Sequence, residues 1–334
     1  MPGVEGFIGR GALGEVRKGS YRGVVVALKA LHLLRTDPES IAAMGTALAP
    51  AERQAVLAAL VKECEMLRRC THANIVPFIG LVIDQEPLYL ALQYIPSGTL
   101  HDLIHGECYA AMRTDAGTLP LQTQLLANCG LFSALAFLAT VPMIHRDVKP
   151  ANILVRVHDE TLEKVLLADF GEAKQLTRTM TVRTMAGTPI YMAPEMREED
   201  DAKGPKADVF SGGVVMVEMS TGTGPNPGPE MRKEGRRRVG VPEEERRAAD
   251  LAAVRHPVIA ELARRCIVDD DGERADAAEI VERLAAATVG GAANEGAAIT
   301  VLVRHVSRGR NFTVEAFPVR HPELKLNRPP CCFV

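Results

Sequence analysis

The chain has 334 residues, of which 47% are hydrophobic and 24% are charged, and its net charge is −3. These values are ordinary for a soluble globular protein with a full hydrophobic core. The near-balance of charge gives no electrostatic reason to expect nucleic acid or an anionic membrane as the main partner.

The seven cysteines are scattered and include no CxxC pair, which disfavours a disulfide framework or a zinc site and favours a reducing setting. The most apolar stretch, residues 130–144, is shorter than the about 20 residues that a bilayer span needs. No basic-then-apolar signal pattern follows Met1. The sequence therefore predicts a cytoplasmic protein without a transmembrane segment.

The first elements along the chain are short strands. Residues 4–29 combine a glycine-rich turn with a β-branched run, which is typical of a hairpin. Residues 39–70 are rich in Ala, Leu, Glu and Arg with helical spacing, so one helix is expected in their second half. Two further strands are expected at residues 75–83 and 88–94.

The rest of the chain is mainly helical. Helical patterns cover residues 121–139, 208–220, 248–266 and 275–287. The Gly/Pro- and charge-rich residues 222–247 predict a surface loop. The Gly/Ala stretch at 288–298 predicts a linker, and the alternation at 299–303 and 311–315 predicts a small hairpin.

Residues 8–16 read Ile-Gly-Arg-Gly-Ala-Leu-Gly-Glu-Val, a glycine-rich turn between two strands. Glycines let backbone amides approach phosphates closely, because no Cβ stands in the way. Taken alone, the motif also fits a plain hairpin turn or a dinucleotide-binding loop. A strand follows it rather than a helix, which disfavours the dinucleotide loop, and this strand ends at Lys29, whose ammonium can reach phosphates.

Three more motifs follow: His-Arg-Asp-Val-Lys-Pro-Ala-Asn at residues 145–152, Asp-Phe-Gly at 169–171 and Ala-Pro-Glu at 193–195. The series, in this order, resembles the eukaryotic protein kinases over residues 5–286. The resemblance implies an α+β, bilobal protein kinase-like fold that binds ATP and Mg²⁺. It implies a domain at 4–286, made of a mainly β N-lobe (4–92), a hinge (93–97) and a larger, mainly α C-lobe (98–286), with a tail at 287–334.

Phosphoryl transfer needs positioning and charge neutralisation more than covalent catalysis. Asp147 is expected to accept a hydrogen bond from the substrate hydroxyl, and Lys149 to stabilise the transferring phosphoryl group. Asn152 and Asp169 supply oxygen ligands, which suit Mg²⁺.

The resemblance implies that a helix carboxylate pairs with Lys29. Glu63 is favoured because it shares a helix face with Leu67, and Glu65 is the alternative. Leu92 would guard the back of the adenine pocket. The further nucleotide contacts are expected from Ile8, Gly9, Arg10, Gly11, Gly14, Val16, Ala27, Gln93, Ile95 and Leu154.

Two segments resemble serine/threonine kinases: Lys149-Pro150 and the run Gly187-Thr-Pro-Ile-Tyr-Met-Ala-Pro-Glu195. Thr188 is expected to bridge Asp147 and Lys149. Residues 71–76 and 208–214 resemble the tyrosine-kinase-like group, whose members are mainly Ser/Thr specific, and dual specificity stays open. Protein substrates are the implied partners.

Three positions depart from the family: Leu13, Gly212 and Val217 stand where an aromatic, a phenylalanine and a tryptophan are common. They put stability in question, because Phe to Gly in a buried helix loses packing and helix propensity. Arg274 stands where the family pairs an arginine with Glu195.

Threonines cluster between Asp169 and Glu195, and Thr184 matches the usual phosphorylation site, with Thr181 as the alternate. Arg146 is expected to have no electrostatic partner until a phosphothreonine, made by an upstream kinase or by the protein itself, pairs with it. The extra residues 30–55 read as a surface insertion, with a regulatory element as the alternative.

Two rival functions are a pseudokinase scaffold and a small-molecule kinase. A pseudokinase would normally lack a catalytic Lys, Asp or Asn, and this chain has all of them. A small-molecule kinase would lack the Ala-Pro-Glu segment and Arg274. The terminal Cys331-Cys332-Phe333-Val334 has the outline of a prenylation box, although valine is not a favoured last residue.

Overall fold

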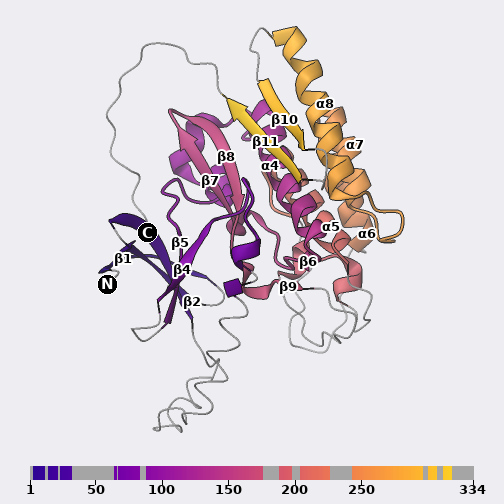
Figure 1. Cartoon of the computed structure of the whole chain (residues 1–334). Helices are drawn as coiled ribbons and strands as arrows, with labels where there is room; N and C mark the ends of the chain where they lie inside the picture. Colours follow the sequence, from indigo (N-terminus) through magenta and orange to yellow (C-terminus); the bar gives the residue numbers. More distant parts are fainter. Residues whose placement is uncertain are drawn as a thin grey trace, which may run out of the picture. The chain divides into compact units, whose positions relative to one another are not determined.

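The computed structural model describes residues 3–11, 14–21, 23–31, 64–65, 67–82, 88–175, 188–197, 204–225, 243–295, 300–306 and 311–317. They form two compact units, of which the first ends at Pro96 and the second begins at Ser97. Figure 1 shows both units in the colours of the sequence. Outside the described residues lie Leu13, residues 32–63 with Glu63 and most of the insertion, Thr181, Thr184, most of the loop at 222–247 and residues 318–334.

The first unit is a five-stranded antiparallel sheet with the strand order β1-β2-β3-β5-β4. Its strands are β1 (Gly3–Gly11), β2 (Gly14–Tyr21), β3 (Val24–Leu31), β4 (Phe78–Val82) and β5 (Leu88–Gln93). Val26, Leu28 and Ala30 are buried on one face and pack with residues of β4 and β5. Because side chains alternate along a strand, Ala27 and Lys29 belong to the other face.

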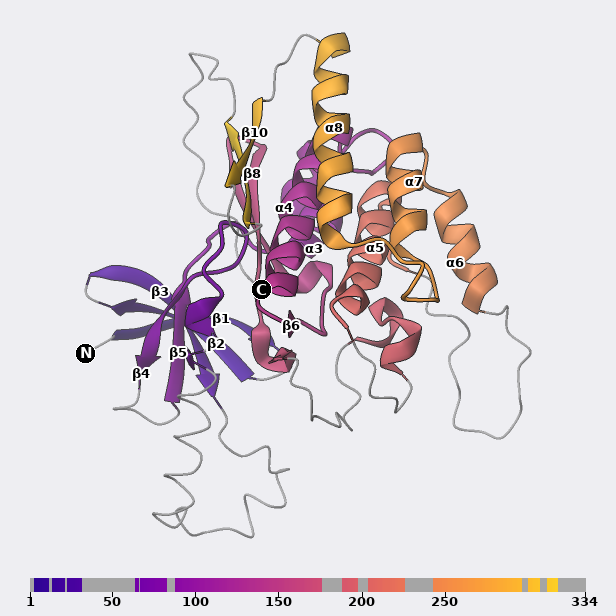
Figure 2. The ribbon, with the colours of Figure 1, turned by 45° about the vertical axis from the view of Figure 1, so that its right-hand side comes forward.

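The second unit is mainly helical (Figure 2). Its helices are α3 (Leu100–His105), α4 (Leu121–Thr140), α5 (Lys206–Thr221), α6 (Glu243–Ala252), α7 (Pro257–Cys266) and α8 (Ala277–Glu295). Helix α4 packs against α5 and α8, and α5 packs against α7. The short strand pairs β6 (Met143–Ile144) with β9 (Lys174–Gln175) and β7 (Ile153–His158) with β8 (Thr161–Leu167) hold the loops between them.

Helix α4 is long and apolar enough to cross a membrane, unlike the shorter stretch that the sequence singles out. In the structure, 78% of the most apolar 18-residue stretch of α4 is buried inside the protein. A helix that is apolar all round is buried on all sides, so α4 is the core helix of this unit.

The helices differ from the sequence prediction in three places. The expected single helix at 248–266 is two helices, α6 and α7, because Pro257 occupies the first turn of α7 and starts a new helix there. Helix α8 continues to Glu295, into the expected linker, although Gly290 and Gly291 disfavour helix, because the helix packs against α4 and tertiary packing overrides local propensity. Helix α3, capped by Thr99, has no counterpart in the predicted elements.

An antiparallel hairpin follows α8, formed by β10 (Thr300–Val306) and β11 (Asn311–Phe317). Strand β11 lies next to α4 and β8, as Figure 1 shows. An isolated hairpin is marginally stable in water, so these neighbours stabilise it.

The packing defect expected at Gly212 is filled by a neighbouring side chain. The ring of Phe132, from α4, is fully buried and lies 3.0 Å from where a Gly212 Cβ would be. The volume that the family fills from position 212 is here filled from α4, and the two glycines of α5 let the neighbouring helices approach closely.

Gly213→Ala should destabilise the protein. A Cβ at this position would lie 2.5 Å from Cys266 Cβ and 2.9 Å from Ile267 Cγ1, so α5 and α7 would have to move apart. Overpacking costs about 1–3 kcal/mol, and the gain in helix propensity offsets at most about 1 kcal/mol of that. Thermal unfolding measures the effect, and Gly204→Ala, whose Cβ meets nothing within 4 Å, is the matched control. An unchanged or raised Tm for Gly213→Ala would contradict the close packing.

Candidate active site

The loop after β6 is anchored by a buried carboxylate on α5. The backbone N–H groups of His145 and Arg146 donate hydrogen bonds to Asp208 Oδ2 and Oδ1, at 2.6 and 2.9 Å. Arg146 has a φ of 72°, in the left-handed region that costs free energy for a non-glycine residue. Burial raises the pKa of Asp208, and the two backbone donors and the charges of His145 and Arg146 counteract that rise. Asp208 therefore holds the loop in a strained conformation.

Asp147 is the centre of a hydrogen-bonded cluster. Lys149 Nζ lies 2.8 Å from Asp147 Oδ2, and Asn152 Nδ2 donates to the same oxygen at 2.7 Å. The backbone N–H and the hydroxyl of Thr188 donate to Asp147 Oδ1 at 3.0 and 3.1 Å. Lys149 Nζ donates to Thr188 Oγ1 at 2.8 Å. Thr188 thus contacts both Asp147 and Lys149, which is the arrangement that the sequence predicts.

Asn152 and Asp169, the expected metal ligands, offer oxygen atoms of the kind that hard cations bind. Asn152 Nδ2 donates to both the side chain and the carbonyl of Asp147, so the amide of Asn152 is held in a fixed orientation with Oδ1 as its remaining polar atom. Asp169 adds a carboxylate, and its Oδ1 accepts from the Gly171 N–H at 3.4 Å. An amide oxygen and a carboxylate fit Mg²⁺.

The Asp-Phe-Gly segment is fixed by a contact with the same loop. The rings of His145 and Phe170 meet edge to face, with centroids 4.9 Å apart. His145 Nε2 lies 2.9 Å from the carbonyl oxygen of Ala168. This packing connects the loop of Asp147 to the segment of Asp169.

In the first unit, the glycine-rich residues form the ends of two paired strands. Gly9 pairs with Val16 and Gly11 with Gly14. Val16 in turn pairs with Lys29, which is 7% exposed. Strand β2 therefore places the glycine turn and Lys29 in adjacent strands of one sheet.

The predicted hinge follows β5. Ala27 pairs with Leu92, and Val26 pairs with Gln93. The Gln93 N–H donates to the Pro77 carbonyl at 3.0 Å, so this donor is not free for adenine. Ile95 is buried, and Leu154, in the second unit, is partly buried.

The expectation that Arg146 has no electrostatic partner is wrong. Arg146 is buried, and its charge lowers the pKa of Asp208, so the two side chains interact. The motif hides this contact because the two residues are 62 positions apart. Glu65, the alternative to Glu63, is exposed in the structure.

The expected pair of Arg274 and Glu195 is present. Arg274 Nη1 and Nη2 donate to Glu195 Oε1 and Oε2 at 2.6 and 3.0 Å, the bidentate geometry of strong arginine–carboxylate pairs. Arg274 is 1% exposed, and it also donates to the backbone carbonyls of Val268 and Lys206. The Ala-Pro-Glu segment is thereby attached to the elements around α5.

A second acid of α5 was missed in the sequence. Glu218 is buried, and its Oε2 accepts from the Tyr191 hydroxyl at 2.7 Å while Oε1 lies 2.8 Å from His105 Nε2. Burial, and then the charge of Glu218, raise the pKa of Tyr191 above its usual range. The available signal was that Asp208 and Glu218 are the only acids in the otherwise apolar sequence of α5.

The sequence of this chain is similar to a known protein family and to individual kinases. The family model of the protein kinase domain matches residues 3–284. Serine/threonine-protein kinase STY46 of Arabidopsis thaliana is 31% identical over 83% of this chain and 42% of its own length. Serine/threonine-protein kinase dst1 of Dictyostelium discoideum is 30% identical over 83% of this chain and 33% of its own. Mitogen-activated protein kinase kinase kinase 3 of Arabidopsis thaliana is 31% identical over 66% and 32%. The chain spans less than half the length of these relatives.

Proposed function

This chain belongs to the protein kinase family, and from that premise we propose that it transfers the γ-phosphate of ATP to serine and threonine hydroxyls of protein substrates. Its kinase domain is of the serine/threonine type by its relatives. The observation that carries the proposal is the contact of Thr188 with both Asp147 and Lys149, because it fixes the two side chains that the reaction needs.

The chemistry assigned to these side chains is an in-line transfer. Asp147 accepts the proton of the substrate hydroxyl. As this happens, the hydroxyl oxygen forms a bond to the γ-phosphorus, and the bond between the γ-phosphorus and the oxygen that bridges it to the β-phosphate breaks. Lys149 lies within hydrogen-bond distance of Asp147 and adds positive charge where the phosphoryl group passes. Asn152 and Asp169 would hold Mg²⁺, which would supply positive charge to neutralise the phosphates.

The proposal also assigns the nucleotide contacts that the family resemblance implies. Lys29 binds the α- and β-phosphates and is held by Glu63, while the glycine turn with Gly9, Arg10, Gly11 and Gly14 covers the phosphates. Ile8, Val16, Ala27 and Leu154 enclose adenine, and Gln93 and Ile95 contribute backbone groups. Since the Gln93 N–H is bonded to Pro77, its contribution is the carbonyl oxygen.

The proposal also covers setting and partners. We expect the protein to act inside the cell, on protein substrates. It would belong to a kinase cascade in which another kinase, or a second copy of this protein, activates it. The domain boundaries proposed from the sequence stand as proposals, with residues 93–97 as the hinge. The boundary between the two compact units falls within these residues, which supports them.

The test of the proposed function is phosphorylation of generic protein substrates with radiolabelled ATP and Mg²⁺, followed by phosphoamino-acid analysis. Label on serine or threonine is the expected result. Label on tyrosine as well would extend the proposal to dual specificity. ATP binding without transfer to any protein would replace it with the pseudokinase scaffold.

We also expect phosphorylation of Thr184, or of Thr181 as the alternate, to raise activity. A phosphothreonine carries a charge of about −1.5 to −2, and its pairing with Arg146, in addition to the interaction of Arg146 with Asp208, would stabilise the active conformation. Mass spectrometry of active protein should find phosphate there, and the Thr181→Ala/Thr184→Ala double variant should lose at least about tenfold in kcat. Thr161→Ala, at an exposed threonine of β8, is the matched control. Full activity of the double variant would contradict this regulation.

A further inference from the structure

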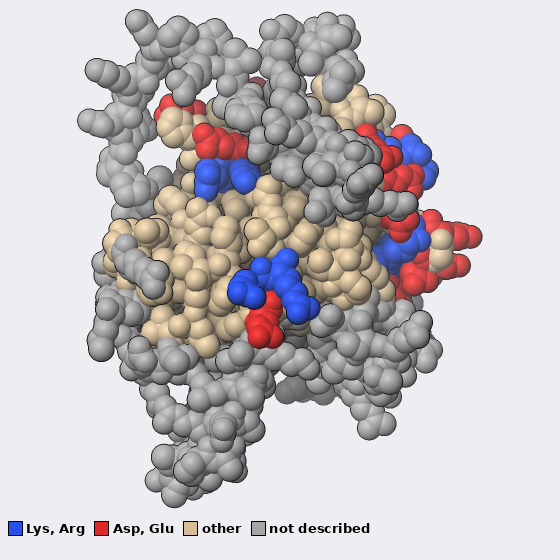
Figure 3. Space-filling model, viewed as in Figure 1, with Lys and Arg blue, Asp and Glu red and all other residues tan. Residues whose placement is uncertain are grey.

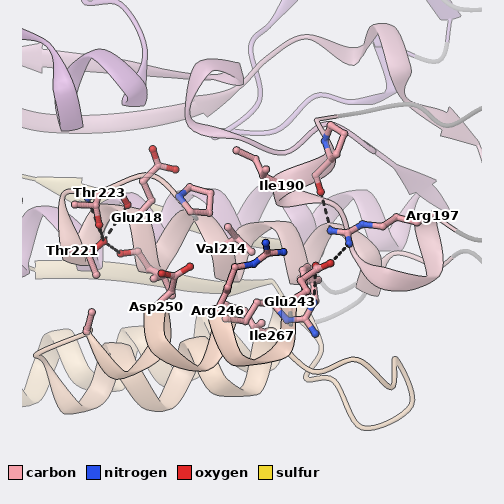
Figure 4. Close-up of a pocket in the computed structure, with 16 residues that line it drawn as sticks. Ile190, Arg197, Val214, Glu218, Thr221, Thr223, Glu243, Arg246, Asp250 and Ile267 are labelled. Carbon is pink, nitrogen blue, oxygen red and sulfur yellow. Dashed lines mark hydrogen bonds and ion pairs between the residues drawn. The ribbon is translucent and has the colours of Figure 1, made fainter. Parts of the chain in front are cut away.

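The second unit contains a cavity of about 580 Å³ beside the segment that follows Thr188 (Figure 4). Its walls come from the turn Pro189–Tyr191, from α5 and α6, and from the start of the loop after α5. The apolar part of the lining includes Ile190, Val214, Val217 and Ile267. This volume and lining are typical of sites that enclose an apolar group of a ligand.

The cavity owes part of its volume to short side chains on α5. Val214 and Val217 lie one turn apart on the face of the helix that lines it. A tryptophan, which the family often has at position 217, would extend into this space. The cavity can therefore hold a large planar side chain supplied by another molecule.

The arginines around the cavity differ in whether they pair with an acidic side chain. Arg197 Nη1 and Arg247 Nη1 lie 2.5 and 2.9 Å from the two carboxylate oxygens of Glu243. Arg246 points into the cavity in Figure 4, and within the described part of the chain no hydrogen bond or ion pair joins it to another residue. The acids of the lining are already engaged: Glu243 by the two arginines, Glu218 by Tyr191 and His105, and Asp250 in an interaction of its own. The charge of Arg246 contributes to lowering the pKa of Glu243, and a ligand with a carboxylate near its apolar group would give Arg246 a hydrogen-bonded partner as well.

We propose that this cavity binds a docking segment of the protein substrate, in which a large aromatic side chain fills the apolar part and a neighbouring carboxylate pairs with Arg246. The inference rests on the proposed function. A peptide is favoured because Pro189 and Ile190 line the cavity and directly follow Thr188, which binds Asp147, so an occupant lies next to the path of the phosphorylated chain. The cavity touches no reacting atom, and its occupation lowers KM without changing kcat.

The test measures phosphorylation of a positional-scanning library of peptides with a single serine, each with one further residue fixed. The wild type should prefer Trp, Phe or Tyr at one position and Asp or Glu near it. Filling the cavity with Val217→Trp should remove the aromatic preference and raise KM for the preferred peptide about tenfold or more, because the aromatic side chain of the peptide would no longer be buried. The kcat for a peptide without the aromatic residue should not change.

The charge-reversal variant Arg246→Glu should replace the acidic preference with a preference for Lys or Arg, and it remains informative if Val217→Trp does not fold. Arg255→Glu, at an exposed position between α6 and α7, is the matched control and should behave as the wild type. Phosphorylation by the wild type without an aromatic or acidic preference, or preferences unchanged in both variants, would overturn the inference alone. Failure of the wild type to phosphorylate any peptide would instead remove the proposed function, and the inference with it.

Discussion

Asp147→Asn should abolish phosphoryl transfer and leave ATP binding intact. The carboxylate accepts four contacts, from the side chains of Lys149, Asn152 and Thr188 and from the backbone N–H of Thr188, and an amide would turn one of its two acceptor atoms into a donor facing donors. Loss of a positioned proton acceptor costs about 100- to 10,000-fold in rate. The measurements are kcat with a peptide substrate and the Kd of ATP by calorimetry.

Asp159→Asn is the control for that experiment. Asp159 is an exposed aspartate of the same unit, at the β7–β8 turn, with a φ of 46° that asparagine tolerates. Its kcat should equal that of the wild type. Undiminished turnover in Asp147→Asn would refute the role of Asp147, and a simultaneous loss of ATP binding would show damage to the fold instead.

Lys29→Met should lower kcat by about 100- to 1,000-fold, the usual cost of removing one preorganised donor from a transition state. Lys29 is 7% exposed and sits in the centre of a five-stranded sheet, where methionine keeps the stem of the side chain and removes its charge. Thermal unfolding should change little, which separates a loss of phosphate positioning from a loss of structure. A kcat within about twofold of the wild type would show that Lys29 does not bind the nucleotide.

The partner of Lys29 can be identified by two isosteric changes. Glu63→Gln should reduce kcat by less than Lys29→Met, because the amide still accepts a hydrogen bond but no longer holds the ammonium by charge. Glu65→Gln, at an exposed position, is its matched control and should have no effect. If Glu65→Gln reduces kcat and Glu63→Gln does not, the register assigned to this helix is wrong.

The protein kinase family and the α+β fold class were predictable from the sequence, and the family comparison and the structure confirm them. The reason is that the motif residues lie close together in the chain: Asp147, Lys149 and Asn152 fall within one short loop, whose spacing is set by the chemistry. Contacts across long separations carry no such signal. The anchoring of residues 145 and 146 by Asp208, and the filling of the Gly212 site by Phe132, depend on which helices pack together.

The cavity was likewise beyond the sequence. The sequence shows that Val217 departs from the family, but the cavity beside it depends on how α6 packs against α5, and the sequence does not show that packing. On the face shown in Figure 3, lysine and arginine side chains of the described residues lie beside acidic ones rather than in a patch of one sign. The described residues of this face therefore offer a partner no patch of one sign, whereas the cavity offers a defined apolar lining that can select a ligand.

Helix α5 carries both of the buried acids that hold the site. Asp208, near its start, fixes the loop of Asp147, and Glu218, ten residues later, fixes Tyr191 in the segment after Thr188. At a rise of about 1.5 Å per residue the two anchors are about 15 Å apart on one rod. Since the residues between them are buried on every side, α5 cannot unfold locally without disrupting the core. The loop of Asp147 and the segment of Tyr191 are therefore held by the same helix, and their spacing persists for as long as the unit remains folded.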